Sequence, residues 1–251
     1  MAFDFKSPTH RLTRTCFSHM SLGNTEHLMR VLRPVLVFIG ERLTLAAALV
    51  AAALLVFLVL AHLVHGGETL RFDAAVFHFF QAHQSPAAHL LMAGISLLAS
   101  GWAISAVSLA CVAAFWMMPA RRPDALALLL AAAGGQGVVY GLKALFHHAR
   151  PDVAFASLGY SFPSGHSFAA VTLYGMLAYW LVCADPRRGA WVWSGAALLI
   201  LLIGFSRVFL GVHYASDVAA GFASGLPWLW GCCALSSYSF GRWGRKAEED
   251  F

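Results

Sequence analysis

The chain has 251 residues, of which 59% are hydrophobic and only 12% are charged. Soluble domains carry about 25% charged residues, so this chain has too little charge to cover a globule of its size. Together with a mean hydropathy of +0.68, this excludes a cytosolic enzyme. A disordered chain is excluded for the opposite reason, since there is ample apolar surface to bury. The composition predicts a polytopic membrane protein.

The net charge of +5 does not indicate a nucleic-acid partner, and we expect none. Membrane proteins collect Lys and Arg on their cytoplasmic side for reasons of topology. The five cysteines are odd in number and show no metal-binding spacing, so we expect neither structural disulfides nor a metal site built from them.

Six apolar segments are long enough to cross the hydrocarbon core, which takes about 20 residues. In chain order they are Leu43–Val64, His89–Met118, Ala125–Phe146, His166–Ala184, Trp191–Phe209 and Val218–Leu235. Aromatic and aliphatic residues alternate with polar ones over Glu68–His83, which predicts an amphipathic helix lying in the membrane interface. The expected fold is therefore all-α, with six transmembrane helices and an interfacial helix after the first. We expect an N-terminal segment (1–42), a six-span domain (43–236) and a charged tail (237–251).

Most of the basic residues fall on one side of a six-span topology. Thirteen of the 17 do so: Lys6, Arg11, Arg14, Arg30, Arg33, Arg42, Arg121, Arg122, Arg187, Arg188, Arg242, Arg245 and Lys246. By the positive-inside rule this side is cytoplasmic, and it holds both termini. We therefore expect a multi-pass protein of the cell (inner) membrane.

Four basic residues remain on the outer side, and three of them, Lys143, Arg150 and Arg207, lie at the outer ends of the third and fifth spans. A Lys or Arg at membrane depth costs about 2.5–3.5 kcal/mol on the insertion scale, so such residues are functional candidates. The Gly137/Gly141 and Gly221/Gly225 pairs, by contrast, are typical of close helix packing.

Three outer segments hold polar residues that an apolar helix would not choose. In the first, six residues separate Lys143 from Arg150, nearly two helical turns, so both cations can face the same way. Pro151 disfavours helical geometry at Arg150, which places that side chain at the end of the helix.

The second segment, Pro163-Ser164-Gly165-His166, opens the fourth span. Ser near an N-cap and a following Gly leave free backbone N–H groups, and a helix N-terminus of this kind can bind an anion. The third segment is Ser206-Arg207, five residues, His213, three residues and Asp217. The last two are at i and i+4 and are close neighbours if the sixth helix begins there.

Together these groups suit phosphoryl transfer. Two guanidinium groups and an ammonium group can surround the phosphate oxygens. Asp217 can orient His213 and keep it neutral as a nucleophile, and His166 can protonate the leaving oxygen.

The three segments resemble the tripartite signature of the type 2 phosphatidic acid phosphatase superfamily. That signature is a Lys, six residues and Arg-Pro, then Pro-Ser-Gly-His, then Ser-Arg, five residues, His, three residues and Asp. The sequence matches at Lys143, Arg150, Pro151, Pro163, Ser164, Gly165, His166, Ser206, Arg207, His213 and Asp217, with no departure. The resemblance extends over about residues 43–235.

The resemblance implies a metal-independent membrane lipid phosphatase with no cofactor. It implies that His213 forms a phosphohistidine, that Asp217 orients it, and that His166 acts first as acid and then as base. The implied phosphate-binding residues are Lys143, Arg150, Ser164, Gly165 and Arg207.

The substrate is expected to be a lipid phosphate or diphosphate from the bilayer: phosphatidic acid, phosphatidylglycerol phosphate, undecaprenyl diphosphate or a lipid A phosphate. Two alternatives remain, a lipid phosphotransferase on the same scaffold and a catalytically silent lipid-binding or transport protein. The oligomeric state and the roles of His147 and His148 stay open. Two adjacent histidines suggest a metal site, but neighbouring positions on a helix point apart, so we expect no metal there.

Overall fold

The computed structural model describes residues 22–151 and 159–249, with side chains for residues 44–151 and 159–236. Part of the expected N-terminal segment, including Lys6, Arg11 and Arg14, lies outside the described residues. The chain divides into two compact units, Met1–Leu49 and Val50–Phe251. The helix α2 (Leu22–His65) begins in the first unit and continues into the second. The second unit holds all the candidate site residues.

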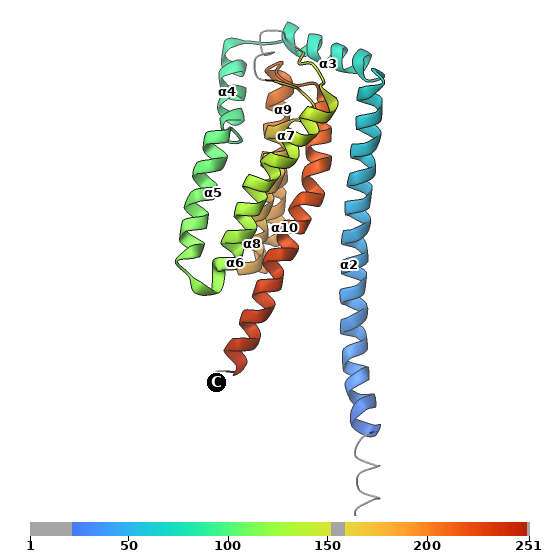
Figure 1. Ribbon diagram of the computed structural model, residues 1–251, viewed down its shortest axis with the longest axis vertical. Helices are drawn as coiled ribbons and strands as arrows, with labels where there is room; N and C mark the ends of the chain where they lie inside the picture. The colour runs from blue at the N-terminus through green and yellow to red at the C-terminus, as the bar shows by residue number, and fades with distance from the viewer. Residues whose placement is uncertain (1–21, 152–158, 250–251) are drawn as a thin grey trace, which may run out of the picture. The chain divides into compact units, whose positions relative to one another are not determined.

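The described part of the second unit is helical (Figure 1). After α2 come α3 (Leu70–Ala82), α4 (Pro86–Leu97), α5 (Gly101–Trp116), α6 (Arg122–Leu129), α7 (Gly135–Phe146), α8 (Gly165–Ala184), α9 (Gly189–Phe209) and α10 (Ala215–Glu249). Short 3₁₀ turns precede α6 and α9, and the π-helical turn Leu130–Gly134 joins α6 to α7.

Six membrane-spanning segments are confirmed among the described residues. They are Thr44–His65, Pro86–Trp116, Pro119–Phe146, Gly165–Ala184, Pro186–Phe209 and Ala215–Ser236. The expected interfacial helix is α3, between the first and second spans. Two helices extend beyond the apolar segments: α2 begins at Leu22, and α10 continues to Glu249. The division into segments 1–42, 43–236 and 237–251 stays a prediction.

Two spans are not regular helices. The second breaks between α4 and α5, where the Ser100 hydroxyl caps α5 by accepting from the backbone N–H of Ala103. The Leu98 carbonyl at this break accepts a hydrogen bond from the Tyr174 hydroxyl at 2.8 Å. In the third span the Ala131 carbonyl, within the π-helical turn, accepts from the Trp228 indole N–H at 3.2 Å. Partners from neighbouring helices thus bind backbone groups at these irregularities, as the membrane interior requires.

The fourth span, α8, is the most enclosed, and it packs against α9 and α10. Gly221 and Gly225 of α10 face it: a Cβ at Gly221 would lie 2.6 Å from the Ser164 carbonyl oxygen. The close-packing interpretation is therefore confirmed for this pair. It is wrong for Gly137 and Gly141 within the described residues, because a Cβ at either would meet no atom within 4 Å.

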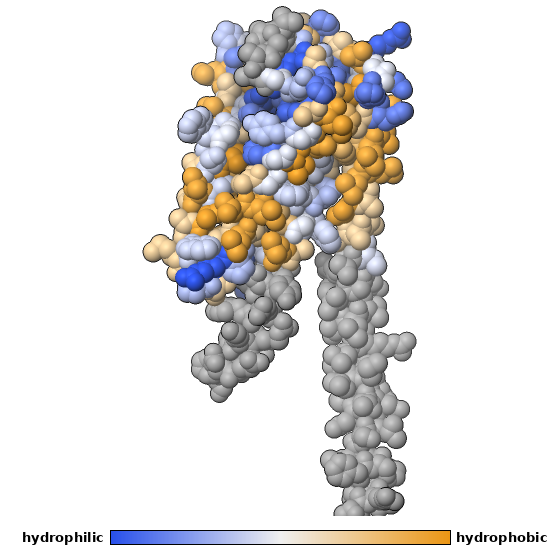
Figure 2. Space-filling view, in the orientation of Figure 1, coloured by the Kyte–Doolittle hydropathy of each residue, from blue (hydrophilic) through white to orange (hydrophobic). Residues whose placement is uncertain are grey.

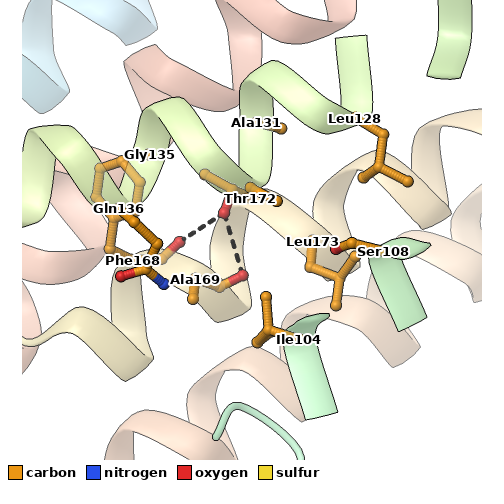
Figure 3. Close-up of a pocket in the computed structure, with 11 residues that line it drawn as sticks. Ile104, Ser108, Leu128, Ala131, Gly135, Gln136, Phe168, Ala169, Thr172 and Leu173 are labelled. Atoms are coloured by element: carbon orange, nitrogen blue, oxygen red, sulfur yellow. Dashed lines mark hydrogen bonds between the residues drawn. The ribbon is translucent and has the colours of Figure 1, made fainter. Parts of the chain in front are cut away.

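A small cavity lies between α5, α8 and the stretch from α6 through the π-helical turn to α7 (Figure 3). Its lining is mostly apolar, and the Thr172 hydroxyl there donates to the carbonyls of Phe168 and Ala169, both at 3.1 Å. None of the candidate site residues lines this cavity, so it is not the candidate site.

Hydrophobic residues cover much of the visible flank of the second unit (Figure 2). Most hydrophilic residues gather at the end drawn at the top of Figure 2, with a smaller group at the opposite end. Large exposed side chains on this unit include Leu55, Leu90, Trp102, Leu145 and Trp191. Exposed apolar area on this scale is typical of a surface that contacts lipid.

Candidate active site

Three segments far apart in the sequence meet at the hydrophilic end of the second unit. They are the end of α7 with the residues after it, the stretch leading into α8, and the connection from α9 to α10. Hydrogen bonds join all three: Ser161 N–H donates to the His148 carbonyl at 2.7 Å, and Ser164 N–H donates to the Asp217 carbonyl at 2.9 Å. The sequence motifs therefore form one site.

His213 and Asp217 form the centre of this site. The Nδ1 atom of His213 lies 3.4 Å from Asp217 Oδ2 and 3.2 Å from the hydroxyl of Ser161. Ser161 donates to the same carboxylate oxygen, and the Tyr214 backbone N–H donates to it at 2.9 Å. His213 is 3% exposed and Asp217 is fully buried. The carboxylate is therefore fixed by several donors, and the predicted His213–Asp217 pairing is present.

A glycine turn carries the chain from α9 to His213. Gly211 has φ +70°, a conformation that side chains disfavour, and a Cβ there would lie 2.6 Å from the Gln81 amide nitrogen. The N–H groups of Val212 and His213 then donate back to the Arg207 carbonyl at 3.2 and 3.3 Å. This turn explains the five residues between Arg207 and His213.

Arg150 lies beside Nε2 of His213. Its Nη1 donates to the Val212 carbonyl at 2.8 Å and lies 3.3 Å from His213 Nε2, while its Nε donates to the Gly159 carbonyl at 2.9 Å. A guanidinium group can only donate, so Nε2 must present its lone pair. The proton of a neutral His213 is then on Nδ1, toward Asp217 and Ser161.

The other two cations come from neighbouring helices. Lys143, in the last turn of α7, donates to the carbonyls of Tyr160 and Ser161. Arg207, in the last turn of α9, donates to the Ser96 hydroxyl of α4 through Nη1. Its Nε is buried and has no hydrogen-bond partner among the described residues. A buried donor without a partner is costly, which favours a missing acceptor at this position.

The start of α8 completes the site. Ser164 is the N-cap, as predicted, and its fully buried hydroxyl accepts from Ser167 N–H at 3.4 Å. Gly165 and His166 form the first turn, where backbone N–H groups have no helical acceptor. The His166 side chain is half-buried.

The interfacial helix α3 supports the site from outside. Asp73, almost fully buried, accepts hydrogen bonds from the N–H and the hydroxyl of Ser216 at 3.0 and 2.6 Å. Ser216 immediately precedes Asp217 in the first turn of α10. The predicted amphipathic helix therefore fixes the α10 terminus, through a carboxylate that sequence analysis did not single out.

Burial and charge set the ionisation of the groups outside the spans. Burial lowers the pKa of His213 to about 4, although the hydrogen bond and charge of Asp217 oppose this. Burial also lowers the pKa of Arg150, again against Asp217, but a guanidinium starts so high that it stays charged. His213 is thus neutral near pH 7, as a nitrogen nucleophile must be.

Sequence reasoning missed Ser161 and left His148 open. The Nδ1 atom of His148 lies 3.3 Å from Asp217 Oδ1. Ser161 precedes Phe162-Pro163 in a polar stretch where any one serine is unremarkable, and no spacing rule links it to Asp217. These contacts arise from the tertiary fold alone.

Fold and site together define a helical membrane protein in which a buried histidine–aspartate pair faces three cations. The PAP2 superfamily model matches residues 124–240. Phosphatidylglycerophosphatase B of Bacillus subtilis is 33% identical over 180 residues, 68% of this chain and 87% of the relative. The chain therefore belongs to the PAP2 superfamily, and the resemblance is confirmed.

Two further comparisons agree. The Escherichia coli protein YbjG, provisionally named an undecaprenyl-diphosphatase, is 32% identical over 129 residues, 47% of this chain and 60% of the relative. The crystal structure of a transmembrane PAP2-type phosphatidylglycerolphosphate phosphatase from Bacillus subtilis has a TM-score of 0.70 and 28% identity. It covers 75% of this chain and 96% of that chain.

Proposed function

We propose that this protein is a membrane lipid phosphatase that works through a phosphohistidine on His213. The observation that carries the proposal is the orientation of that imidazole: Nδ1 faces Asp217 and Ser161, and Nε2 faces Arg150. A neutral imidazole held this way directs its lone pair toward a group of cations, where a phosphate would bind.

In the first step, the substrate phosphate displaces the carbonyl contacts of Lys143 and Arg150 and also engages the buried Nε of Arg207. Nε2 of His213 attacks phosphorus as the bond to the leaving oxygen breaks, and His166 donates a proton to that oxygen. The Nδ1 proton stays hydrogen-bonded to Asp217, which stabilises the charge on the phosphorylated ring.

In the second step, His166, now neutral, accepts a proton from water as the water oxygen attacks phosphorus. The phosphorus–nitrogen bond breaks, and inorganic phosphate leaves with His213 neutral again. The Ser164 hydroxyl and the Gly165 backbone N–H provide further donors at the α8 N-terminus. Three fixed side-chain cations take the place that a metal ion has in other phosphoryl-transfer sites.

The proposed substrate is a lipid phosphomonoester or diphosphate. Phosphatidylglycerol phosphate is the first choice, because the relative with 87% of its length matched is named for that activity. Undecaprenyl diphosphate is the second, from the name of the Escherichia coli relative. We place the site on the outer face of the cell membrane, with both termini cytoplasmic, from the distribution of basic residues.

The test is phosphate release by the purified protein from a panel of these lipids, without any acceptor lipid, compared with His213→Ala. We expect phosphate release from at least one lipid and a loss of about 10³-fold or more in the variant, as for loss of a catalytic nucleophile. Release unchanged in His213→Ala would contradict the mechanism. Phosphate that appears only in an added lipid acceptor would instead indicate a phosphotransferase.

Metal independence has its own test. Activity should be unchanged by excess EDTA, because the proposed charge stabilisation comes from Lys143, Arg150 and Arg207. The measurement is initial rate before and after chelation and dialysis. Loss of activity that magnesium restores would contradict the metal-free scheme.

A further inference from the structure

Asp217 is held from two sides, and only one of them carries the nucleophile. Oδ2 receives the Tyr214 N–H and the Ser161 hydroxyl and faces His213. Oδ1 is contacted by His148, whose Nδ1 atom lies 3.3 Å away. The carboxylate therefore lies between two imidazole rings, from segments 69 residues and four residues away in sequence.

The environment of His148 favours a fixed side chain. Its side chain is 16% exposed, its ring lies 5.5 Å from that of Tyr214, and its carbonyl accepts the Ser161 N–H. A carboxylate can only accept, so His148 must donate through Nδ1–H. A hydrogen bond that an ionised carboxylate accepts is stronger than one between neutral groups of the same geometry.

We infer that His148 is a positioning residue that acts through Asp217. By holding Oδ1, it fixes the rotation of the carboxylate and so keeps Oδ2 directed at Nδ1 of His213. Without it, a fully buried carboxylate oxygen loses its donor. The Tyr214 N–H and the Ser161 hydroxyl then hold Oδ2 alone, so the carboxylate can rotate about that oxygen and the geometry toward His213 is less well fixed. The inference rests on the proposed function, because it assigns His148 a part in activating the same nucleophile.

The neighbouring residue, His147, provides a control for substitutions at His148. His147 is the C-cap of α7, with φ 50°, and its ring meets that of Tyr160 edge-on at 4.5 Å. Asn adopts this left-handed conformation readily, so His147→Asn removes the imidazole next to His148 without straining the backbone.

The test compares His148→Leu, which removes the donor, with His148→Asn, whose amide nitrogen is bonded to Cγ as Nδ1 is in His. We expect kcat of His148→Leu to fall about tenfold or more, as for loss of a hydrogen bond to a charged group, with KM within about twofold. His148→Asn should recover most of kcat, and His147→Asn should match the wild type. Wild-type kcat in His148→Leu, or equal losses in the Leu and Asn variants at unchanged thermal stability, would overturn the inference.

A double-mutant cycle separates positioning from general destabilisation. If His148 acts through Asp217, His148→Leu should lower kcat by less than about twofold in the Asp217→Ala background. The same fold loss in both backgrounds would overturn the inference. His213→Ala, assayed alongside, tests the proposed function itself: an inactive His213→Ala with a fully active His148→Leu contradicts only the role of His148.

Discussion

His213 is a titratable side chain that the fold keeps uncharged. It is 3% exposed, and burial brings its pKa down to about 4, whereas an exposed imidazole has about 6.5. Arg150, 3.3 Å from Nε2, adds positive charge on the side where a second proton would bind. Burial and Arg150 therefore keep the imidazole neutral, and the contact with Arg150 leaves the lone pair on Nε2.

This burial predicts a pH-dependent cost in stability. Between about pH 6.5 and 4 the unfolded chain binds a proton at His213 that the folded chain does not, so folding stability falls as pH decreases through this window. We expect the melting temperature of the wild type, relative to His213→Gln, to drop by a few degrees between pH 7 and pH 5.

The measurement is thermal unfolding of both proteins in the same detergent across that range. The other histidines are present in both proteins, so the difference in melting temperature isolates the contribution of His213. A difference that does not change with pH would contradict the low pKa of His213.

Among the helices, the close packing of α10 on α8 fixes the position of Asp217 relative to Ser164, the N-cap of α8. A Cβ at Gly221 would lie 2.6 Å from the Ser164 carbonyl oxygen and 2.8 Å from Ser167 Cβ. Since the Ser164 N–H also donates to the Asp217 carbonyl, any shift of the helices alters the site directly.

Gly221→Ala should therefore lower both stability and activity, at a cost of about 1–3 kcal/mol for overpacking. Gly137→Ala is the matched control, because a Cβ there meets nothing within 4 Å and Ala favours the helix equally in both places. We expect a lower melting temperature and reduced phosphate release for Gly221→Ala only. Equal melting temperatures and equal phosphate release in the two variants would show that the close packing of α10 on α8 does not constrain the site.

Apolar length and motif spacing predicted the six spans, the interfacial helix and the meeting of the three polar segments. The irregularities could not be predicted, because the break before α5 and the π-helical turn depend on partners from α8 and α10. For the same reason, the spacing shared by Gly137/Gly141 and Gly221/Gly225 did not show that only the second pair packs closely against another helix. Within the site, Ser161 and His148 escaped prediction because their link to Asp217 exists only in three dimensions.

At the scale of the whole molecule, the distribution of charge gives an orientation. Arg121, Arg187 and Arg188 lie in the connections before α6 and α9, and Arg122 is the first residue of α6. Lys143 and Arg207, by contrast, lie in the last turns of α7 and α9. By the positive-inside rule, we propose that the site lies on the outer side. A phosphatase in the proposed orientation would act on lipid headgroups of the outer leaflet.

Cysteine labelling tests this orientation. In a variant whose five native cysteines are replaced, Glu68→Cys lies in the exposed connection before α3 and Arg187→Cys in the exposed connection before α9. A membrane-impermeant maleimide should label Glu68→Cys in intact cells and Arg187→Cys only after permeabilisation. The reverse pattern would place the site in the cytoplasm.

Rapid-quench labelling shows whether His213 carries the phosphoryl group during turnover. Purified protein mixed with a lipid substrate bearing radiolabelled phosphate should form, before steady state, a protein-bound label that acid removes and alkali does not, as expected for a phosphoramidate. Peptide mapping should place it on His213, and His213→Ala should form none. Label on another residue, or rapid phosphate release with no labelled protein at any time, would contradict the proposed mechanism.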